Sequence, residues 1–130
     1  MLKAIFALGS ALVAAPLLAS PYVQHHLAGV SDRETVIPYS EVQQSVRGHG
    51  DVFFVKDRNN QWYRLQFNAG CAGLTTDANT LVFQHHGAGQ QIDRFTTVKI
   101  PEEVRSCAIE SIRESLAPPQ VNSRSPVTLD

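Results

Sequence analysis

The sequence has few of the residues, and none of the motifs, that usually mark a catalytic or cofactor site. Its 130 residues include two cysteines, one tryptophan and one methionine. It contains no Gly-x-Ser-x-Gly, no His-Glu-x-x-His and no phosphate-binding glycine loop. Eleven Lys and Arg residues balance twelve Asp and Glu residues, and neither sign gathers in a block. This pattern argues against nucleic acid or an anionic membrane as a partner, and we expect no enzyme and no cofactor.

Long apolar runs are also absent, apart from a short one at the N-terminus. Lys3 precedes the uncharged residues 4–18, which are rich in Leu, Ile, Phe and Val, and small residues follow at Ala19 and Ser20. A charged head, an apolar centre too short to span a bilayer and a small-residue cleavage site are typical of a secretory signal peptide. We expect residues 1–19 to be removed and the mature chain to be periplasmic or secreted, without a stable membrane anchor. Cleavage after Ser20 and a buried N-terminal helix are the alternatives.

Cys71 and Cys107, the two cysteines, both lie in the part of the chain expected to be exported. An oxidising compartment favours disulfides, and two cysteines allow a single intramolecular connectivity. Closing a loop of this length would stabilise the fold by roughly 3–4 kcal/mol in the chain-entropy model. A nucleophilic cysteine remains an alternative, because the base and the lowered pKa that it needs are not visible in a sequence. The favoured interpretation is a structural disulfide.

Runs of β-branched and aromatic residues predict most of the strands. Residues 51–56 and 61–67 flank the polar residues 57–60, as in a β-hairpin. Residues 80–85 and 95–100 predict two further strands. The expected fold is mainly β (α+β), a small antiparallel sheet of about four to five strands with one or two short helices.

Two segments suggest helix. Ser40 can cap a short helix over residues 41–46, ended by Gly48. Between residues 101 and 116 the apolar positions recur every fourth residue, which predicts a helix, while a strand over residues 107–112 is the alternative.

The domain boundaries follow from where the periodic patterns begin and end. We expect a mobile leader over residues 20–34, one small disulfide-linked domain over residues 35–116, and a disordered polar tail over residues 117–130.

Three segments together resemble a family of small bacterial exported proteins of unknown function. They are Asp51 to Phe67, Cys71-Ala72-Gly73-Leu74, and Cys107-Ala108-Ile109-Glu110-Ser111-Ile112. The resemblance covers about the middle half of the chain and implies that the two cysteines pair. It also favours a strand over residues 107–112, with a helical turn kept for residues 101–105. It implies an architecture and no catalytic residue, and the His85-His86-Gly87 stretch departs from the family pattern.

Histidines are the candidate metal ligands, since neutral imidazole binds copper, zinc and nickel. Adjacent residues on a strand point to opposite faces, so His85 and His86 share a metal only if the strand has ended before Gly87. His49 is a third candidate, and with Asp51 it also resembles an acid–base pair in a glycine-rich turn. The favoured interpretation for all of them is an ordinary polar surface.

Aromatic residues are the candidates for a contact surface, because aromatics are enriched at protein interfaces. In residues 62–67, Tyr63, Leu65 and Phe67 share one face and are expected in the core, while Trp62 lies on the other face. Trp62, with Tyr39 and Phe53, could form an exposed surface, but the favoured interpretation is that a small domain needs them for its own core.

The function expected from these observations is an exported envelope protein that acts as a non-catalytic binding or structural module. Its partner would be another envelope protein, and inhibition of a secreted hydrolase is one concrete form of that activity. The alternative is a periplasmic metal-binding protein that uses the histidines.

Overall fold

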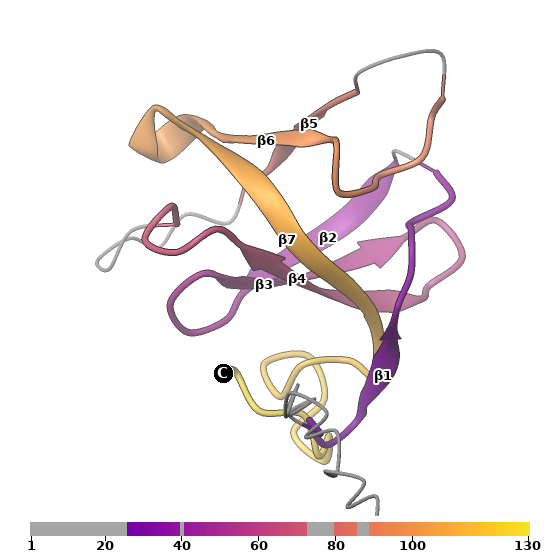
Figure 1. The fold of residues 1–130 in the computed structure, drawn as a ribbon. Helices are drawn as coiled ribbons and strands as arrows, with labels where there is room; N and C mark the ends of the chain where they lie inside the picture. The colour runs from indigo at the N-terminus through magenta and orange to yellow at the C-terminus, as the bar shows by residue number, and fades with distance from the viewer. Residues whose placement is uncertain (1–25, 40, 73–79, 86–88) are drawn as a thin grey trace, which may run out of the picture.

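One antiparallel sheet that curls over on itself forms most of the molecule (Figure 1). The computed structural model describes residues 26–39, 41–72, 80–85 and 89–130. The expected signal peptide, residues 1–19, lies outside the described residues. The elements are β1 (Val30–Glu34), β2 (Val42–Arg47), β3 (Val52–Asp57), β4 (Trp62–Phe67), β5 (Val82–Gln84), β6 (Thr97–Ile100), the 3-10 turn η1 (Pro101–Glu103) and β7 (Arg105–Ser115).

The sheet is organised around β7, its longest strand, which runs diagonally across the view in Figure 1. The strand order is β2-β3-β4-β7-β6-β5, and β1 adds to β7 outside this path. The first part of β7, residues 105–108, pairs with β6, and residues 109–115 pair with β4. Because one half of β7 pairs with β6 and the other half with β4, this strand joins the β2-β3-β4 part of the sheet to the β5-β6 part.

The predicted hairpin is confirmed as β3 and β4, and a buried aspartate holds its turn. One carboxylate oxygen of Asp57 accepts hydrogen bonds from the main-chain N–H groups of Asn59 and Gln61, at 2.8 and 3.0 Å. The other oxygen accepts a hydrogen bond from the Tyr63 hydroxyl at 3.3 Å. These bonds satisfy the acceptors of a carboxylate that would be costly to bury unpaired.

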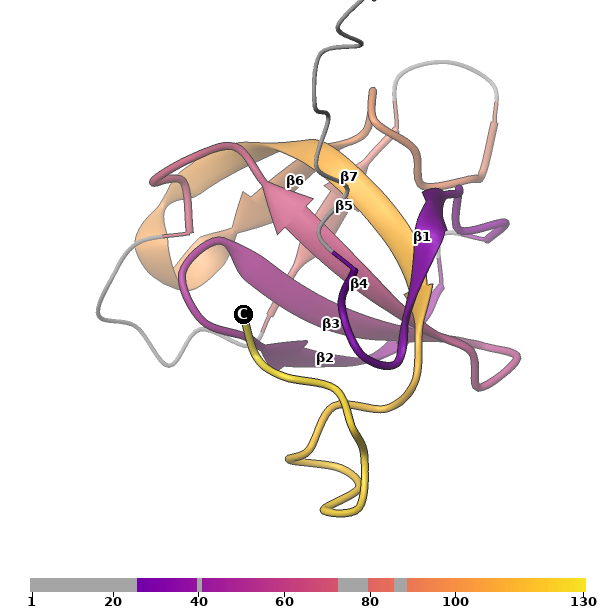
Figure 2. The same cartoon turned by 60° about the horizontal axis from the view of Figure 1, so that its bottom comes forward.

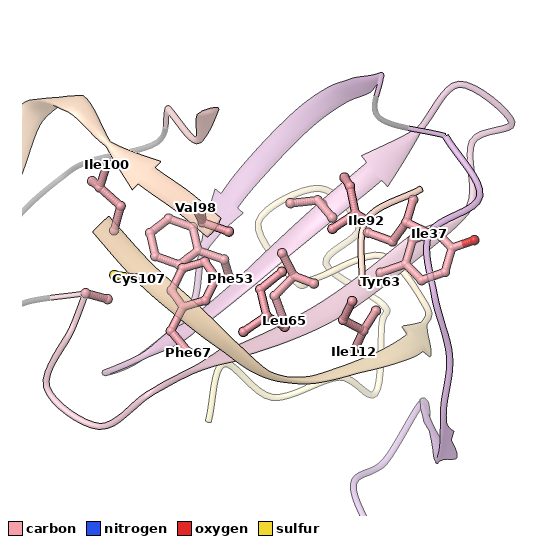
Figure 3. Close-up of a cluster of buried hydrophobic side chains, with 13 residues drawn as sticks. Ile37, Phe53, Tyr63, Leu65, Phe67, Ile92, Val98, Ile100, Cys107 and Ile112 are labelled. Atoms are coloured by element: carbon pink, nitrogen blue, oxygen red, sulfur yellow. The ribbon is translucent and has the colours of Figure 1, made fainter. Parts of the chain in front are cut away.

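The inner cluster lies between the two parts of the curled sheet (Figure 3). The predicted core face of β4 contributes fully, because Tyr63, Leu65 and Phe67 are all buried there. The other buried members are Ile37, Phe53, Val55, Ala72, Ile92, Val98, Ile100, Cys107, Ile109 and Ile112. Phe53 and Phe67 contact each other, with ring centroids 5.3 Å apart.

The outer cluster covers the opposite face of β3 and β4. Its buried members are Val30, Val52, Phe54, Trp62 and Val127. The β3-β4 hairpin is therefore buried on both faces, which explains why both strands have nearly continuous burial rather than alternation. In Figure 2 the C-terminal segment, in yellow, lies against the side of β2 and β3.

The predicted disulfide is confirmed. Cys71 and Cys107 are bonded, with their Cα atoms 5.7 Å apart and a sequence separation of 36. Cys107 belongs to the inner cluster, so the bond ties the loop after β4 to the start of β7.

The strand favoured by the family resemblance is also confirmed, because residues 107–112 lie in β7. The helical period is not a buried face, because Val104, Ala108 and Leu116 are exposed and only Ile112 of the four is buried. The strand β7 instead contains a bulge. Phe67 pairs with Ile109 and Gln66 with Ser111, so β7 contains an extra residue opposite this step. The bulge shifts the alternation, so that Ile109 and Ile112 both reach the inner cluster although they are three positions apart. The helical turn at residues 101–105 is present as η1.

Two predictions about the elements are wrong. The sheet has seven strands rather than four to five. Residues 41–46, predicted to be helical, lie in or next to β2, which pairs with β3. The buried strand β3 needs a hydrogen-bonding partner on each side, and this requirement overrides the weak helical pattern.

The segments expected to be a mobile leader and a disordered tail have defined structure where they are described. Residues 30–34 form β1, and the tail covers the outer cluster with Val127, which is buried. Gly29 adopts a φ of +72°, and a Cβ there would lie 2.7 Å from Cγ2 of Val127. This close approach requires glycine. Where they are described, both segments contribute apolar side chains to the outer cluster on β3 and β4.

Candidate binding surface

A cleft of about 290 Å³ lies where β5, β6, η1 and β7 meet. We call this region the η1 corner and define it by the residues that line the cleft: Val82, Lys99, Ile100, Pro101, Val104, Arg105 and Ser106. Ile100 is fully buried, while Val82 is exposed at the rim. A concave lining that combines apolar with a few polar or charged side chains is the usual composition of a small recognition site.

Val104 projects from this corner into solvent. It is 91% exposed, and its backbone lies in the left-handed region with φ 52° and ψ 43°. A β-branched residue rarely adopts this conformation, which glycine or asparagine tolerates better. The Val104 N–H closes the turn by donating to the carbonyl oxygen of Pro101 at 3.1 Å. The corner therefore combines an unfavourable backbone conformation with an aliphatic side chain exposed to water.

Polar contacts hold the corner in place. Arg47, at the end of β2, pairs with Glu103 at 3.6 Å, and both side chains are largely buried. The Arg47 guanidinium also lies over the Phe53 ring, 5.3 Å from its centroid. Arg105 donates to the carbonyl oxygen of Gly70 at 3.2 Å. These contacts tie η1 and the start of β7 to β2 and to the loop after β4.

Asp51 and the disulfide fix the loop whose Gly70 carbonyl oxygen accepts the hydrogen bond from Arg105. The Asp51 carboxylate accepts hydrogen bonds from the main-chain N–H groups of Gly70, at 2.8 Å, and Ala72, at 3.0 Å. Cys71 lies between them and is bonded to Cys107, three positions after Val104. The exposed turn is therefore built on a rigid base.

The rim of the cleft is basic. Lys99 and Arg105 both line it, and within the described residues neither forms an ion pair with an acid. Two acids, Glu102 and Glu103, lie in η1. Glu103 pairs with Arg47. The pKa of Glu102 is lowered by its own main-chain N–H and by hydrogen bonds from Thr80. Because a lowered pKa keeps Glu102 ionised, it offsets part of this charge, and among the described residues Lys99 and Arg105 leave the corner with a net positive charge.

The strand β5 forms an edge of the sheet beside this cleft. Val82, Phe83 and Gln84 pair with Lys99, Val98 and Thr97 of β6. Val82 and Gln84 are exposed, whereas Phe83 packs on the inner cluster. In the part of the chain that the structure describes, β5 has no second strand partner. Its outer main-chain groups form an edge to which a further strand can add.

The predicted aromatic surface is not formed by Trp62. Trp62 is 7% exposed and belongs to the outer cluster, with the Lys56 ammonium 5.9 Å from its ring centroid. Tyr39 is at the surface, where the Arg58 guanidinium covers its ring at 3.5 Å from the centroid. Phe53 lies in the inner cluster. Trp62 therefore has a packing role, as the core interpretation predicted, and of the three only Tyr39 reaches the surface.

The histidines have separate local partners. Nδ1 of His49 lies 2.8 Å from a carboxylate oxygen of Asp130, and Nδ1 of His85 donates to the carbonyl oxygen of Gln91 at 2.9 Å. His49 and Asp51 contact different groups and do not form a pair. His86 lies outside the described residues. Among the described side chains, no three His, Cys, Asp or Glu residues gather to hold a metal ion.

A second, more polar cavity of about 170 Å³ lies beside His85. It is lined by His85, Gly89, Gln91, Asp93 and Thr96. The Asp93 carboxylate accepts hydrogen bonds from Gln91, Phe95 and Thr96, which lower its pKa against the opposing effect of desolvation. These bonds are local turn contacts, so the carboxylate is already satisfied by its neighbours.

Sequence reasoning missed the η1 corner. Val104 was grouped with Ala108 and Ile112 as one face of a helix. The useful signal was the combination of Pro101 with an aliphatic residue enclosed by Glu103 and Arg105, a charged setting that favours an exposed turn. Its left-handed backbone and its place beside β5 depend on the tertiary structure.

Comparison with known proteins finds no significant match. No protein-family model matches the chain, and no curated protein or solved structure matches it significantly. The resemblance to a family of exported proteins therefore stays a prediction. No helix within the described residues is long and apolar enough to cross a membrane.

Proposed function

We propose that this protein is an exported, non-catalytic binding module and that the η1 corner is its contact surface. The observation that carries the proposal is Val104, which is 91% exposed in a left-handed conformation beside an apolar cleft. Strained residues cost of order 1–3 kcal/mol and cluster at ligand-binding and switch regions. The cost at Val104 brings no packing within the chain, so a contact outside the chain is the best explanation for it.

The construction of the corner supports a role in recognition. Preorganised surfaces bind more tightly because less conformational freedom is lost on association. Here the disulfide, the Arg47–Glu103 pair and the Arg105–Gly70 hydrogen bond all restrain the turn. A rigid turn with an apolar tip is suited to enter a pocket on a partner.

The proposed compartment is the periplasm or the exterior of the cell. The disulfide fits an oxidising compartment. Residues 1–19 carry the pattern of a secretory signal. Another envelope protein is therefore the proposed partner, and a secreted hydrolase inhibited through the η1 corner is one form of that interaction.

The native mass of protein isolated from the periplasm, without reductant or chelator, tests the compartment. The proposal expects the mass of a chain cleaved after Ala19, less two hydrogens for the disulfide. An uncleaved or reduced chain would contradict export.

Site-specific cross-linking in living cells tests the contact surface. A photoreactive residue in place of Ser106, which is exposed and lines the cleft, should give a discrete adduct with one envelope protein. Val104→Asn should abolish the adduct, because asparagine suits the left-handed backbone but removes the aliphatic tip. Val121→Asn, an exposed valine on the tail, is the matched control and should leave the adduct unchanged. An adduct that is insensitive to Val104→Asn would place the contact elsewhere.

A further inference from the structure

We infer that the partner contributes an extended acidic segment, which adds to β5 as a further strand and places an aliphatic side chain in the cleft of the η1 corner. This inference rests on the proposed function and names the chemistry of the partner.

The edge of β5 supplies the main-chain part of the recognition. Residues 82–84 form main-chain hydrogen bonds with β6, and the described chain offers them no other strand. An added strand would continue the ladder and satisfy the outer N–H and C=O groups of β5. Because side chains alternate across a strand, the added residues beside Val82 would lie on the same face as the exposed Val82 side chain.

The cleft supplies the side-chain part. At about 290 Å³ it is at the small end of the range of ligand pockets, about 300–1,000 Å³. Its apolar lining residues are Val82, Ile100, Pro101 and Val104. This composition suits one aliphatic side chain of a peptide better than a large cofactor.

Charge selects an acidic partner. Lys99 and Arg105 line the cleft. Of the two acids of η1, Glu103 pairs with Arg47 and Glu102 stays ionised, so the described residues leave a net positive charge at the corner. Lys99 is also the register partner of Val82, so its charge lies directly beside the edge strand. Acidic residues on the added strand would meet these groups and favour association.

The same charges argue against a second copy of this chain as the occupant. Symmetric pairing of two β5 edges would bring Lys99 and Arg105 of both copies to one interface. Juxtaposed like charges oppose association, so a homodimer through this edge is disfavoured.

Peptide binding to the oxidised full-length chain tests the inference. The probe is a short acetylated peptide that alternates valine with glutamate, and the comparison peptide replaces each glutamate with lysine. The glutamate peptide should bind saturably and the lysine peptide should bind more weakly by about tenfold or more. The double variant Lys99→Glu, Arg105→Glu should reverse this preference. Arg33→Glu with Arg124→Glu, two exposed arginines outside the corner, is the charge-matched control and should preserve it.

N-methylation separates strand addition from simple filling of the cleft. Two versions of the glutamate peptide carry methyl groups on alternate main-chain nitrogens, one in each frame. Strand addition requires the N–H groups of one frame only, so one version should bind and the other should not. Equal binding of both versions, equal binding of the lysine peptide, or no binding of the glutamate peptide would overturn the inference.

The outcomes distinguish this inference from the proposed function. If the adduct at position 106 depends on Val104 but the glutamate peptide does not bind, the η1 corner remains a contact surface and the acidic strand is wrong. If the adduct is also absent, both fall. A concentration-dependent dimer that Val82→Lys abolishes would overturn the inference in favour of a second copy.

Discussion

At Val104 the conformation that we propose for binding lowers the stability of the free protein. Its left-handed backbone is unfavourable for valine, and its side chain gains nothing from burial. Val104→Asn should therefore raise the free energy of unfolding by about 1 kcal/mol. Chemical denaturation of the oxidised protein measures this change. Val121→Asn, which replaces an exposed valine without positive φ, should have almost no effect. Destabilisation by Val104→Asn would show that the side chain has a packing role.

Tyr63, which is hydrogen-bonded to Asp57 in the hairpin turn, makes the stability of the fold depend on pH in the alkaline range. Burial, followed by the charge and hydrogen bond of Asp57, raises its pKa from 10.0 to about 12. The unfolded chain releases this proton near pH 10, whereas the folded chain keeps it. The resulting contribution to stability is complete below pH 10 and is lost as the pH rises towards 12.

Unfolding measured across this window tests the assignment. The free energy of unfolding of the wild type should fall more steeply between pH 10 and 12 than that of Tyr63→Phe. Tyr39→Phe removes a tyrosine from the surface and should retain the wild-type slope. Identical slopes for all three proteins would contradict a raised pKa at Tyr63.

At the scale of elements, the disulfide is the strongest single restraint on the η1 corner. It closes a loop with a sequence separation of 36, which corresponds to roughly 3–4 kcal/mol in the chain-entropy model. Replacing both Cys71 and Cys107 by serine should lower the free energy of unfolding by about this amount. Reduction of the wild type should have a comparable effect in the same denaturation experiment. A loss well below about 1 kcal/mol would show that the remaining contacts already fix the loop.

The elements that the sequence predicted correctly are those with a strong local pattern. The hairpin of β3 and β4 combines continuous β-forming runs with a polar turn, and the structure adds the buried Asp57 that closes it. The helical prediction for residues 41–46 is wrong for a tertiary reason. The segment of β2 is weakly apolar and becomes a strand because β3 offers an unpaired edge. The helical period before Leu116 is coincidental, because in β7 and its flanks only Ile112 of Val104, Ala108, Ile112 and Leu116 is buried.

At the scale of the whole molecule, the C-terminal tail completes the fold. Val127 is buried against Phe54 and Trp62 on the outer face of the sheet. Val127→Asp should undock the tail, because an unpaired charge cannot remain in an apolar cluster. We expect a red shift of the Trp62 emission and a loss of about 1–3 kcal/mol in the free energy of unfolding. Val121→Asp, at an exposed position of the same tail, should change neither quantity.

The tail also explains why the sequence did not predict the candidate site. Its polar composition resembles that of a disordered segment, and a few apolar residues, Val127 and Leu129 among them, make its contacts with the outer cluster. That contact buries Trp62, which the sequence left open as an exposed aromatic. The η1 corner was missed for the complementary reason. Its exposure follows from the curl of the sheet, which brings β5, β6 and β7 together and has no local signature.

Amide hydrogen exchange of the protein, free and bound to the envelope partner identified by cross-linking, tests the central claim most directly. A contact at the η1 corner predicts slower exchange at residues 82–84 and 99–106 in the complex. The surface around Tyr39 and Arg58 should exchange at the same rate in both states. Protection confined to that surface, with residues 82–84 and 99–106 unchanged, would contradict the assignment of the η1 corner as the binding surface.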